Sequence, residues 1–215
     1  MRRHRAVAVS AAAFLITVLS APVQAWECPP DGSARSPSVR SLNHLKNRTA
    51  IPSAADIDPN VTLKAMVAPG DDSSRWSTGR AAVIEGYVAD VKIGGVESVN
   101  CGAKDPADRD THIELTLSPM NDVERAHVIV EVTPRLRAAM AGQGKNWSTN
   151  ALRAQLMGRW VRVTGWLLFD REHVAQSANT ASRRARKVWR ATAWELHPIT
   201  SLELLPGRYQ PSQPR

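Results

Sequence analysis

Apolar and polar residues alternate through the middle of the chain, and this period of two predicts a set of β-strands. The first predicted strand is long and contains Gly86, and a glycine inside a strand often marks a bulge or a bend. The last is expected to bend or break at Pro198. The strands are expected at residues 81–93, 111–117, 126–132, 159–169 and 188–205.

The second predicted strand shows the alternation most clearly. Ile113 and Leu115 lie on one face, whereas His112 and Glu114 lie on the other. Residues 126–132 alternate in the same way, with valines on one face. This pattern is typical of half-buried strands, which have one face on the core.

The period changes after residue 132. Thr133 and a proline at the first helical position predict a helix start, and Ser148 or Thr149 can cap a second helix over 150–157. Three strands, a helical segment and two strands is the chain order of the OB-fold. We therefore expect a mainly β protein, a five-stranded OB-like Greek-key barrel with a helical insertion between strands 3 and 4. Another small barrel or an α+β sandwich is the alternative.

The beginning of the chain resembles an export signal. Arg2, Arg3, His4 and Arg5 precede an apolar run over 6–19, and Val23 and Ala25 provide the small side chains that signal peptidase requires. The apolar run has about 14 residues, whereas a membrane anchor needs about 20. We predict a signal peptide at 1–25 that is cut after Ala25, and hence a periplasmic or secreted protein.

The remaining chain divides by composition into three parts. We expect an N-terminal arm with short helices at 26–79, the barrel domain at 80–205 and a flexible tail at 206–215. No later apolar run is long enough to cross a membrane. Without residues 1–25 the net charge falls from +8 to +5, which permits an anionic partner but does not require one.

Two cysteines, Cys28 and Cys101, remain after the predicted cleavage. In an oxidising compartment an even pair predicts a disulfide, and two unpaired thiols are the alternative. Closing so long a loop would contribute about 4 kcal/mol in the chain-entropy model.

Two long loops mark the expected binding face. In OB barrels the ligand crosses strands 2 and 3, between the loop that joins strands 1 and 2 and the loop that joins strands 4 and 5. Here these loops are 94–110 and 170–187. The second contains a basic run that favours an anionic ligand, although a solvated loop tip would show the same pattern. The run consists of Arg183, Arg184, Arg186 and Lys187.

Tryptophans are concentrated in the last two predicted strands. Trp160 and Trp166, with Arg162 between them, lie opposite a valine face, so we expect at least one of them to be exposed or covered by the arm. Exposed indoles beside arginine would form a stacking platform for bases or sugars. Packing in a core of large residues is the alternative.

A polar group near the same rim provides candidate catalytic residues: His112, Glu114, His173, Glu195 and His197. The three histidines are also the candidate metal ligands, for zinc or another divalent ion. Their spacing matches no established metal or nucleophile motif. Histidines that bond the backbone would be the structural alternative. No cofactor is predicted, and a divalent metal remains compatible with the pattern.

Three segments carry a resemblance: residues 110–115, residues 165–170 with His173, and residues 189–198. They look like a group of uncharacterised exported bacterial proteins with a predicted OB-like core. The resemblance covers roughly residues 81–205. It implies the barrel and a periplasmic setting, and it implies no activity.

Together these features favour a non-catalytic binding module that recognises nucleic acid, a glycan or an envelope component between the loops 94–110 and 170–187. The alternative is a metal-dependent hydrolase or phosphodiesterase that uses the His/Glu cluster. A structural partner in the cell envelope is a third hypothesis. The absence of a strong catalytic motif favours binding over catalysis.

Overall fold

The computed structural model of the 215-residue chain describes residues 28–120, 123–181 and 187–206. The predicted signal peptide lies outside these residues, as do Arg183, Arg184, Arg186 and all but the first residue of the predicted tail.

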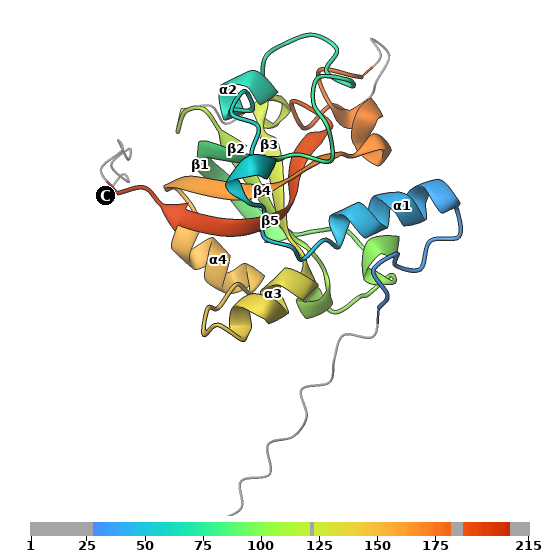
Figure 1. Cartoon of the computed structure of the whole chain (residues 1–215). Helices are drawn as coiled ribbons and strands as arrows, with labels where there is room; N and C mark the ends of the chain where they lie inside the picture. The colour runs from blue at the N-terminus through green and yellow to red at the C-terminus, as the bar shows by residue number, and fades with distance from the viewer. Residues whose placement is uncertain (1–27, 121–122, 182–186, 207–215) are drawn as a thin grey trace, which may run out of the picture.

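The five strands form one closed barrel (Figure 1). They follow one another around it in the order β1-β2-β3-β5-β4, and only the pair β3–β5 is parallel. This mixed five-stranded barrel is consistent with the predicted OB-like fold. The strands are β1 (Ala81–Ile93), β2 (Thr111–Thr116), β3 (Val128–Val132), β4 (Trp160–Phe169) and β5 (Trp194–Leu204).

The first strand serves both sides of the barrel. The N-terminal part of β1 pairs with β4 and its C-terminal part with β2, and the register shifts between Val88 and Asp90. The sequence pattern suggested a bulge or bend at Gly86, but the register shift lies two to four residues further along the strand. Gly86 has a packing role, because a Cβ there would lie 2.7 Å from Leu63 Cδ2.

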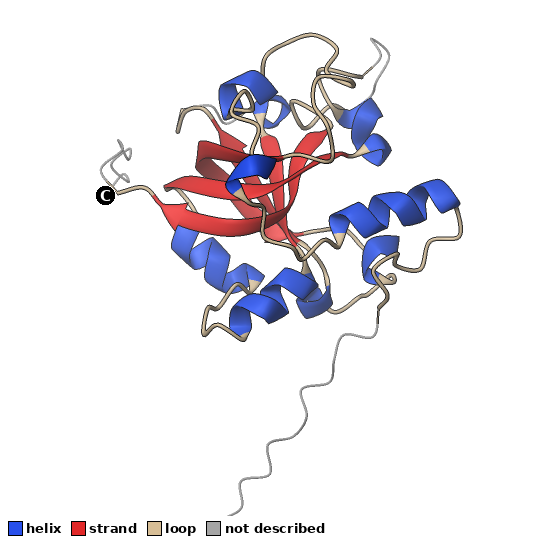
Figure 2. Cartoon of the chain, viewed as in Figure 1, coloured by secondary structure: helices blue, strands red, loops and turns tan. Residues whose placement is uncertain are grey.

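Two helices lie between β3 and β4, as predicted, and occupy one end of the barrel (Figure 2). They are α3 (Pro134–Ala141) and α4 (Thr149–Leu156). The hydroxyl of Thr133 accepts a hydrogen bond from Leu136 N, and that of Ser148 accepts one from Ala151 N. Their buried leucines complete the core at this end.

The segment before the barrel contains α1 (Pro37–Lys46) and α2 (Leu63–Met66), and α2 lies at the end of the barrel opposite α3 and α4 (Figure 2). Val61, Leu63 and Met66 belong to the same hydrophobic core as the strands. This segment is thus packed into the barrel domain. None of the described helices is long and apolar enough to cross a membrane.

The predicted disulfide between Cys28 and Cys101 is confirmed. It joins the start of the described chain to the loop between β1 and β2. Two asparagine side chains bind the same loop. Asn43, within α1, donates to Ser98 Oγ, and Asn47, the residue after α1, donates to Val99 O. Residues 98–101 are therefore held covalently and by hydrogen bonds.

Two features of the strands differ from expectation. The last strand begins at Trp194, and residues 188–193 precede it without regular structure. Both β2 and β3 are buried on both faces, although their alternation is typical of half-buried strands. On β2 the polar face is covered in part by Trp189, from the segment before β5, which lies beside His112.

Gly165 on β4 allows a close approach of β5 opposite Pro198. A Cβ at Gly165 would lie 2.8 Å from Pro198 O and 2.9 Å from Ile199 Cα, and backbone atoms cannot move aside easily. We expect Gly165→Ala to lower the free energy of unfolding by roughly 2 kcal/mol, measured by urea denaturation. Gly79→Ala, where the nearest atom lies at 3.5 Å, is the matched control. Equal stability of the two variants would contradict this packing.

Candidate functional site

Ionisable side chains occupy the outer faces of β2, β3 and β5, and almost none of their surface reaches solvent. They are His112 and Glu114 on β2, Glu131 on β3, and Glu195 and His197 on β5, each at most 8% exposed. In OB barrels the outer face of strands 2 and 3 is where ligands bind. Here the face is covered, so each charge must find a partner within the protein.

Lys46, the last residue of α1, enters this region and is 1% exposed. Its Nζ lies 2.8 Å from Asp170 Oδ2 and 3.1 Å from Glu97 Oε2. Burial alone would lower the pKa of Lys46, but the surrounding carboxylates outweigh it and raise that pKa well above its usual value. Lys46 is therefore charged and neutralises two acidic groups.

Arg190 provides a second buried cation from the segment before β5. Its Nη2 lies 2.8 Å from Glu195 Oε2, and its Nε donates to Thr192 O. The other oxygen of Glu195 lies 3.1 Å from His197 Nδ1. Glu195 thus links a fixed guanidinium to the ring of His197, and this contact orients the imidazole.

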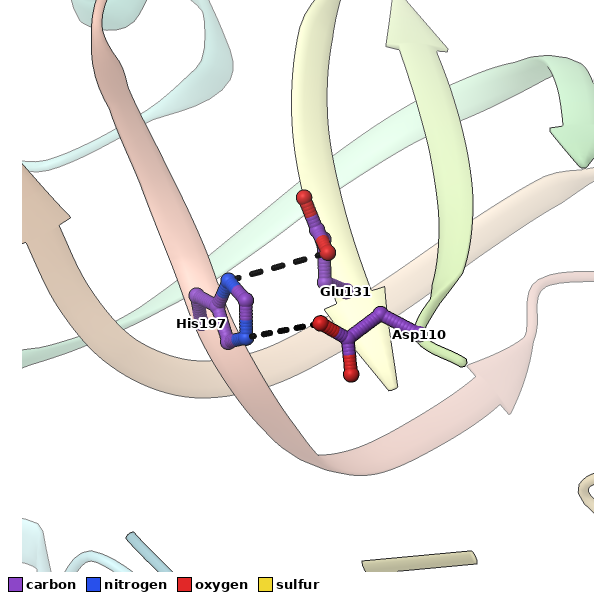
Figure 3. Close-up of side chains that lie close together, drawn as sticks. All are labelled: Asp110, Glu131 and His197. Atoms are coloured by element: carbon purple, nitrogen blue, oxygen red, sulfur yellow. Dashed lines mark ion pairs between the residues drawn. The ribbon is translucent and has the colours of Figure 1, made fainter. Parts of the chain in front are cut away.

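Two further carboxylates face the ring nitrogens of His197 from one side (Figure 3). Its Nδ1 is 3.7 Å from Glu131 Oε2, and its Nε2 is 3.9 Å from Asp110 Oδ2. Burial alone would lower the pKa of His197, but Glu131, Glu195 and Asp110 raise it to about 9. Burial raises the pKa of Asp110 to about 6, against the opposing effect of His197.

Glu131 connects this group to β2. It is opposite His112 in the register of β2 and β3, and its Oε1 pairs with His112 Nε2. Burial would raise the pKa of Glu131, but His112 and His197 lower it below its usual range. Burial would likewise lower the pKa of His112, but Glu131 raises it. One carboxylate therefore contacts two histidines, one on each side.

Glu114 belongs to a separate pair on the same face. His127 Nδ1 lies 2.5 Å from Glu114 Oε2, and Lys92 binds the other oxygen. Burial alone would raise the pKa of Glu114, but the hydrogen bonds from His127 and Lys92 outweigh it and lower that pKa to about 2.

A cleft of about 310 Å³ opens above this buried network. It lies between the two loops, since Gly94, Gly95 and Glu97 line it from the first and His173 and Lys187 from the second. The remaining lining residues come from the strands and the segments beside them: Lys92, Ile93, His112, Glu124 and Trp189.

Trp189 lies at the centre of the contacts in this cleft. Its ring centroid is 6.1 Å from that of His112 and 5.6 Å from that of His173, which it meets edge to face. Lys92 Nζ lies 5.9 Å from the centre of the same ring. The cleft thus combines a half-buried indole with lysine and imidazole groups, and the carboxylates of Glu97 and Glu124 also line it.

The predicted stacking residues lie elsewhere. Trp160, Arg162 and Trp166 are on β4, whose neighbours in the barrel are β1 and β5. Arg162 bridges Glu85 and Glu203 across these strands. Trp166 is covered by the arm, because its Nε1 donates to Ala50 O and Arg48 lies over its ring. Trp189 occupies the cleft instead.

The three candidate histidines separate into two places. His112 and His173 flank Trp189 in the cleft, whereas His197 lies in the buried group with Asp110 and Glu131. Within the described residues, that buried group is the only set of three whose ligand atoms come close enough to hold a metal ion. A site made of all three histidines is therefore not formed.

Several residues of the network gave no sequence signal for a site. Lys46 comes from a segment without strand periodicity and Arg190 from the beginning of the predicted last strand, and the roles of both depend on the tertiary fold. Glu131 was visible as a polar residue on β3, and its pairing with His112 follows once the strand register is known. His127 could have been found in the same way.

A second hollow, of about 520 Å³, lies along α1. Asp31, Arg40 and His44 line it, and the two basic groups already pair with the carboxylate. It is separate from the buried network.

No protein-family model matches the sequence, and no curated protein matches it. The candidate site is therefore assigned by its geometry and chemistry.

The role of Lys46 can be tested by Lys46→Met, which keeps the length of the side chain and removes the charge. We expect a loss of about 3 kcal/mol in the free energy of unfolding, because Asp170 and Glu97 lose their buried cation. Urea denaturation at neutral pH measures it. Lys64→Met, at an exposed position of the same segment, should change stability little. Similar values for both variants would refute the role of Lys46.

The lowered pKa of Glu114 predicts that the stability of the protein depends on pH. Because its pKa is about 2 in the folded protein and 4.5 ordinarily, its contribution is complete above pH 4.5 and declines as the pH falls toward 2. We expect Glu114→Gln to cost about 2 kcal/mol at pH 6, after allowance for solvent screening. Denaturation from pH 6 to pH 3 should show the difference from the wild type shrinking. A difference that is constant over this range would contradict the pKa assignment.

Proposed function

We propose that this protein is an exported, non-catalytic binding module that recognises an anionic, oligomeric ligand in the cleft between loops 94–110 and 170–187. The observation that carries the proposal is the lining of that cleft, which places Trp189 among His112, His173, Lys92 and Lys187. Such a set supplies an aromatic surface together with positive charge.

The size of the cleft suits a single sugar or nucleotide unit of an oligomeric ligand. A volume of about 310 Å³ is at the lower end of the range for small-molecule sites, about 300–1,000 Å³, and suits one sugar or one nucleotide. The ring of Trp189 is half-buried, and such a ring can stack against a base or a sugar face. Neighbouring units of an oligomer would then extend along the loops.

The polar groups of the cleft favour binding over catalysis. His112 is held by Glu131 and His173 by Asp170, so buried carboxylates fix both rings. The group of described residues that can hold a metal ion lies among the buried side chains and does not include these two histidines. A metal-dependent hydrolase, the second candidate, would need the metal exposed in the cleft.

The disulfide supports the location in this proposal. Structural disulfides form and persist outside the cytoplasm, and Cys28 lies three residues after the predicted cleavage point. The natural partner is then an anionic glycan, an envelope component or extracellular nucleic acid.

Lys187 provides a test, because it is exposed where it lines the cleft. The mature protein would be titrated with a single-stranded oligonucleotide, a sulfated glycan fragment and an uncharged oligosaccharide over a series of salt concentrations. We expect an anionic probe to bind, with affinity that falls as salt rises, and Lys187→Glu to weaken it about 10-fold at low salt. Tryptophan fluorescence or calorimetry provides the readout.

Lys145→Glu is the matched control, since Lys145 is exposed on the connection between α3 and α4 and the charge change is identical. It should leave affinity nearly unchanged. Equal loss in the two variants would indicate an effect of net charge alone, and failure of every anionic probe would refute the proposal.

A further inference from the structure

Two buried side chains beneath the cleft carry polar atoms without a well-aligned hydrogen-bond partner. Among the described residues, these atoms include both carboxylate oxygens of Asp110 and Nε2 of His197, although Asn100 lies close enough to Asp110 to lower its pKa through a hydrogen bond. Asp110 is 2% exposed and His197 is 0% exposed. Buried polar groups nearly always have partners, so two facing groups of this kind point to a ligand that both could bind.

The distance between these two groups is informative. His197 Nε2 and Asp110 Oδ2 are 3.9 Å apart, which is too long for a hydrogen bond. Two ligand atoms that each lie about 2.1 Å from one metal ion are at most about 4.2 Å apart. Glu131 adds a third group, since one ligand atom from each of the three residues lies within 4.8 Å of the others. The spacing of Asp110 and His197 already fits two ligands of one ion, and a small movement of the Glu131 side chain would bring its carboxylate within the same limit.

The surrounding contacts hold the ligands in position. Glu195 Oε1 lies 3.1 Å from His197 Nδ1, so a hydrogen bond there leaves Nε2 to face Asp110 (Figure 3). A carboxylate that accepts the second ring N–H is a recurrent feature of histidines that bind metal. Glu131 is oriented in turn by His112, which binds its other oxygen.

We propose that Asp110, Glu131 and His197 bind one divalent metal ion of the zinc class in the interior of the protein. One imidazole and two carboxylates are suitable ligands for Zn²⁺, whereas Mg²⁺ and Ca²⁺ prefer oxygen alone. Two carboxylates also balance the charge of the ion.

The burial of all three ligands assigns a structural role to the ion. It would join the start of β2, the C-terminal part of β3 and β5, three strands that meet beneath the cleft. The proposal does not depend on anion binding, because the ligands are different residues from those that line the cleft.

The experiment uses the mature protein without a histidine tag and with its disulfide intact, so that no thiol competes for metal. After treatment with EDTA and its removal, Zn²⁺ is titrated by calorimetry, and thermal unfolding is recorded with and without the ion. We expect one equivalent to bind and to raise the Tm. Mg²⁺ at the same concentration should not. A Co²⁺-loaded sample should show a visible spectrum typical of mixed nitrogen and oxygen ligands.

Asp110→Asn keeps the size of the side chain and removes one charged ligand. We expect it to weaken Zn²⁺ binding at least 10-fold, and Glu131→Gln to do the same if Asp110→Asn does not fold. Glu114→Gln removes a buried carboxylate that pairs with His127, and it should retain the affinity of the wild type. No binding by the wild type, or equal affinity in the wild type, Asp110→Asn and Glu131→Gln, would overturn the proposal.

Discussion

The ion pairs of Lys46 with Asp170 and Glu97 place a strong constraint on this fold. A lysine ammonium and a carboxylate that are both 1% exposed have lost nearly all of their hydration, and only close contact compensates for that loss. The contact brings together the end of α1, the residue after β4 and the loop between β1 and β2. Because these segments are far apart in sequence, the pairing requires that the barrel and its N-terminal segment fold as one unit.

Because the β2–β3–β5 face is covered, its polar groups divide into two sets. One set lines the cleft, where an indole and basic groups are accessible. The other is a group of carboxylates and imidazoles that solvent scarcely reaches. His112 belongs to both, since it lines the cleft and binds Glu131 beneath it. A ligand that moves the His112 ring would therefore act directly on a buried charge.

Local pattern was sufficient to predict the strands and the helical insertion, because alternation and helix caps are read over a few residues. The disulfide was predictable from the cysteine count. The site was predictable only in part. His112 and Glu114 were recognised as the polar face of a strand, yet their surroundings depend on residues from other segments: Trp189 beside His112, and Lys92 and His127 beside Glu114. Trp160 and Trp166 lie on β4 and do not line the cleft, and this too could not be read from local pattern, since which side of a barrel a strand presents depends on its neighbours.

The disulfide gives the maturation of the protein an order in time. Cys101 follows Asn100, and the loop that contains both also carries Glu97, the partner of Lys46. The bridge can close only under oxidising conditions and only when residue 101, which follows the whole of β1, is present. Closure fixes this loop beside Asp110. The position of this loop therefore depends on a covalent step that is separate from the collapse of the apolar core, and a chain with reduced cysteines would lack it.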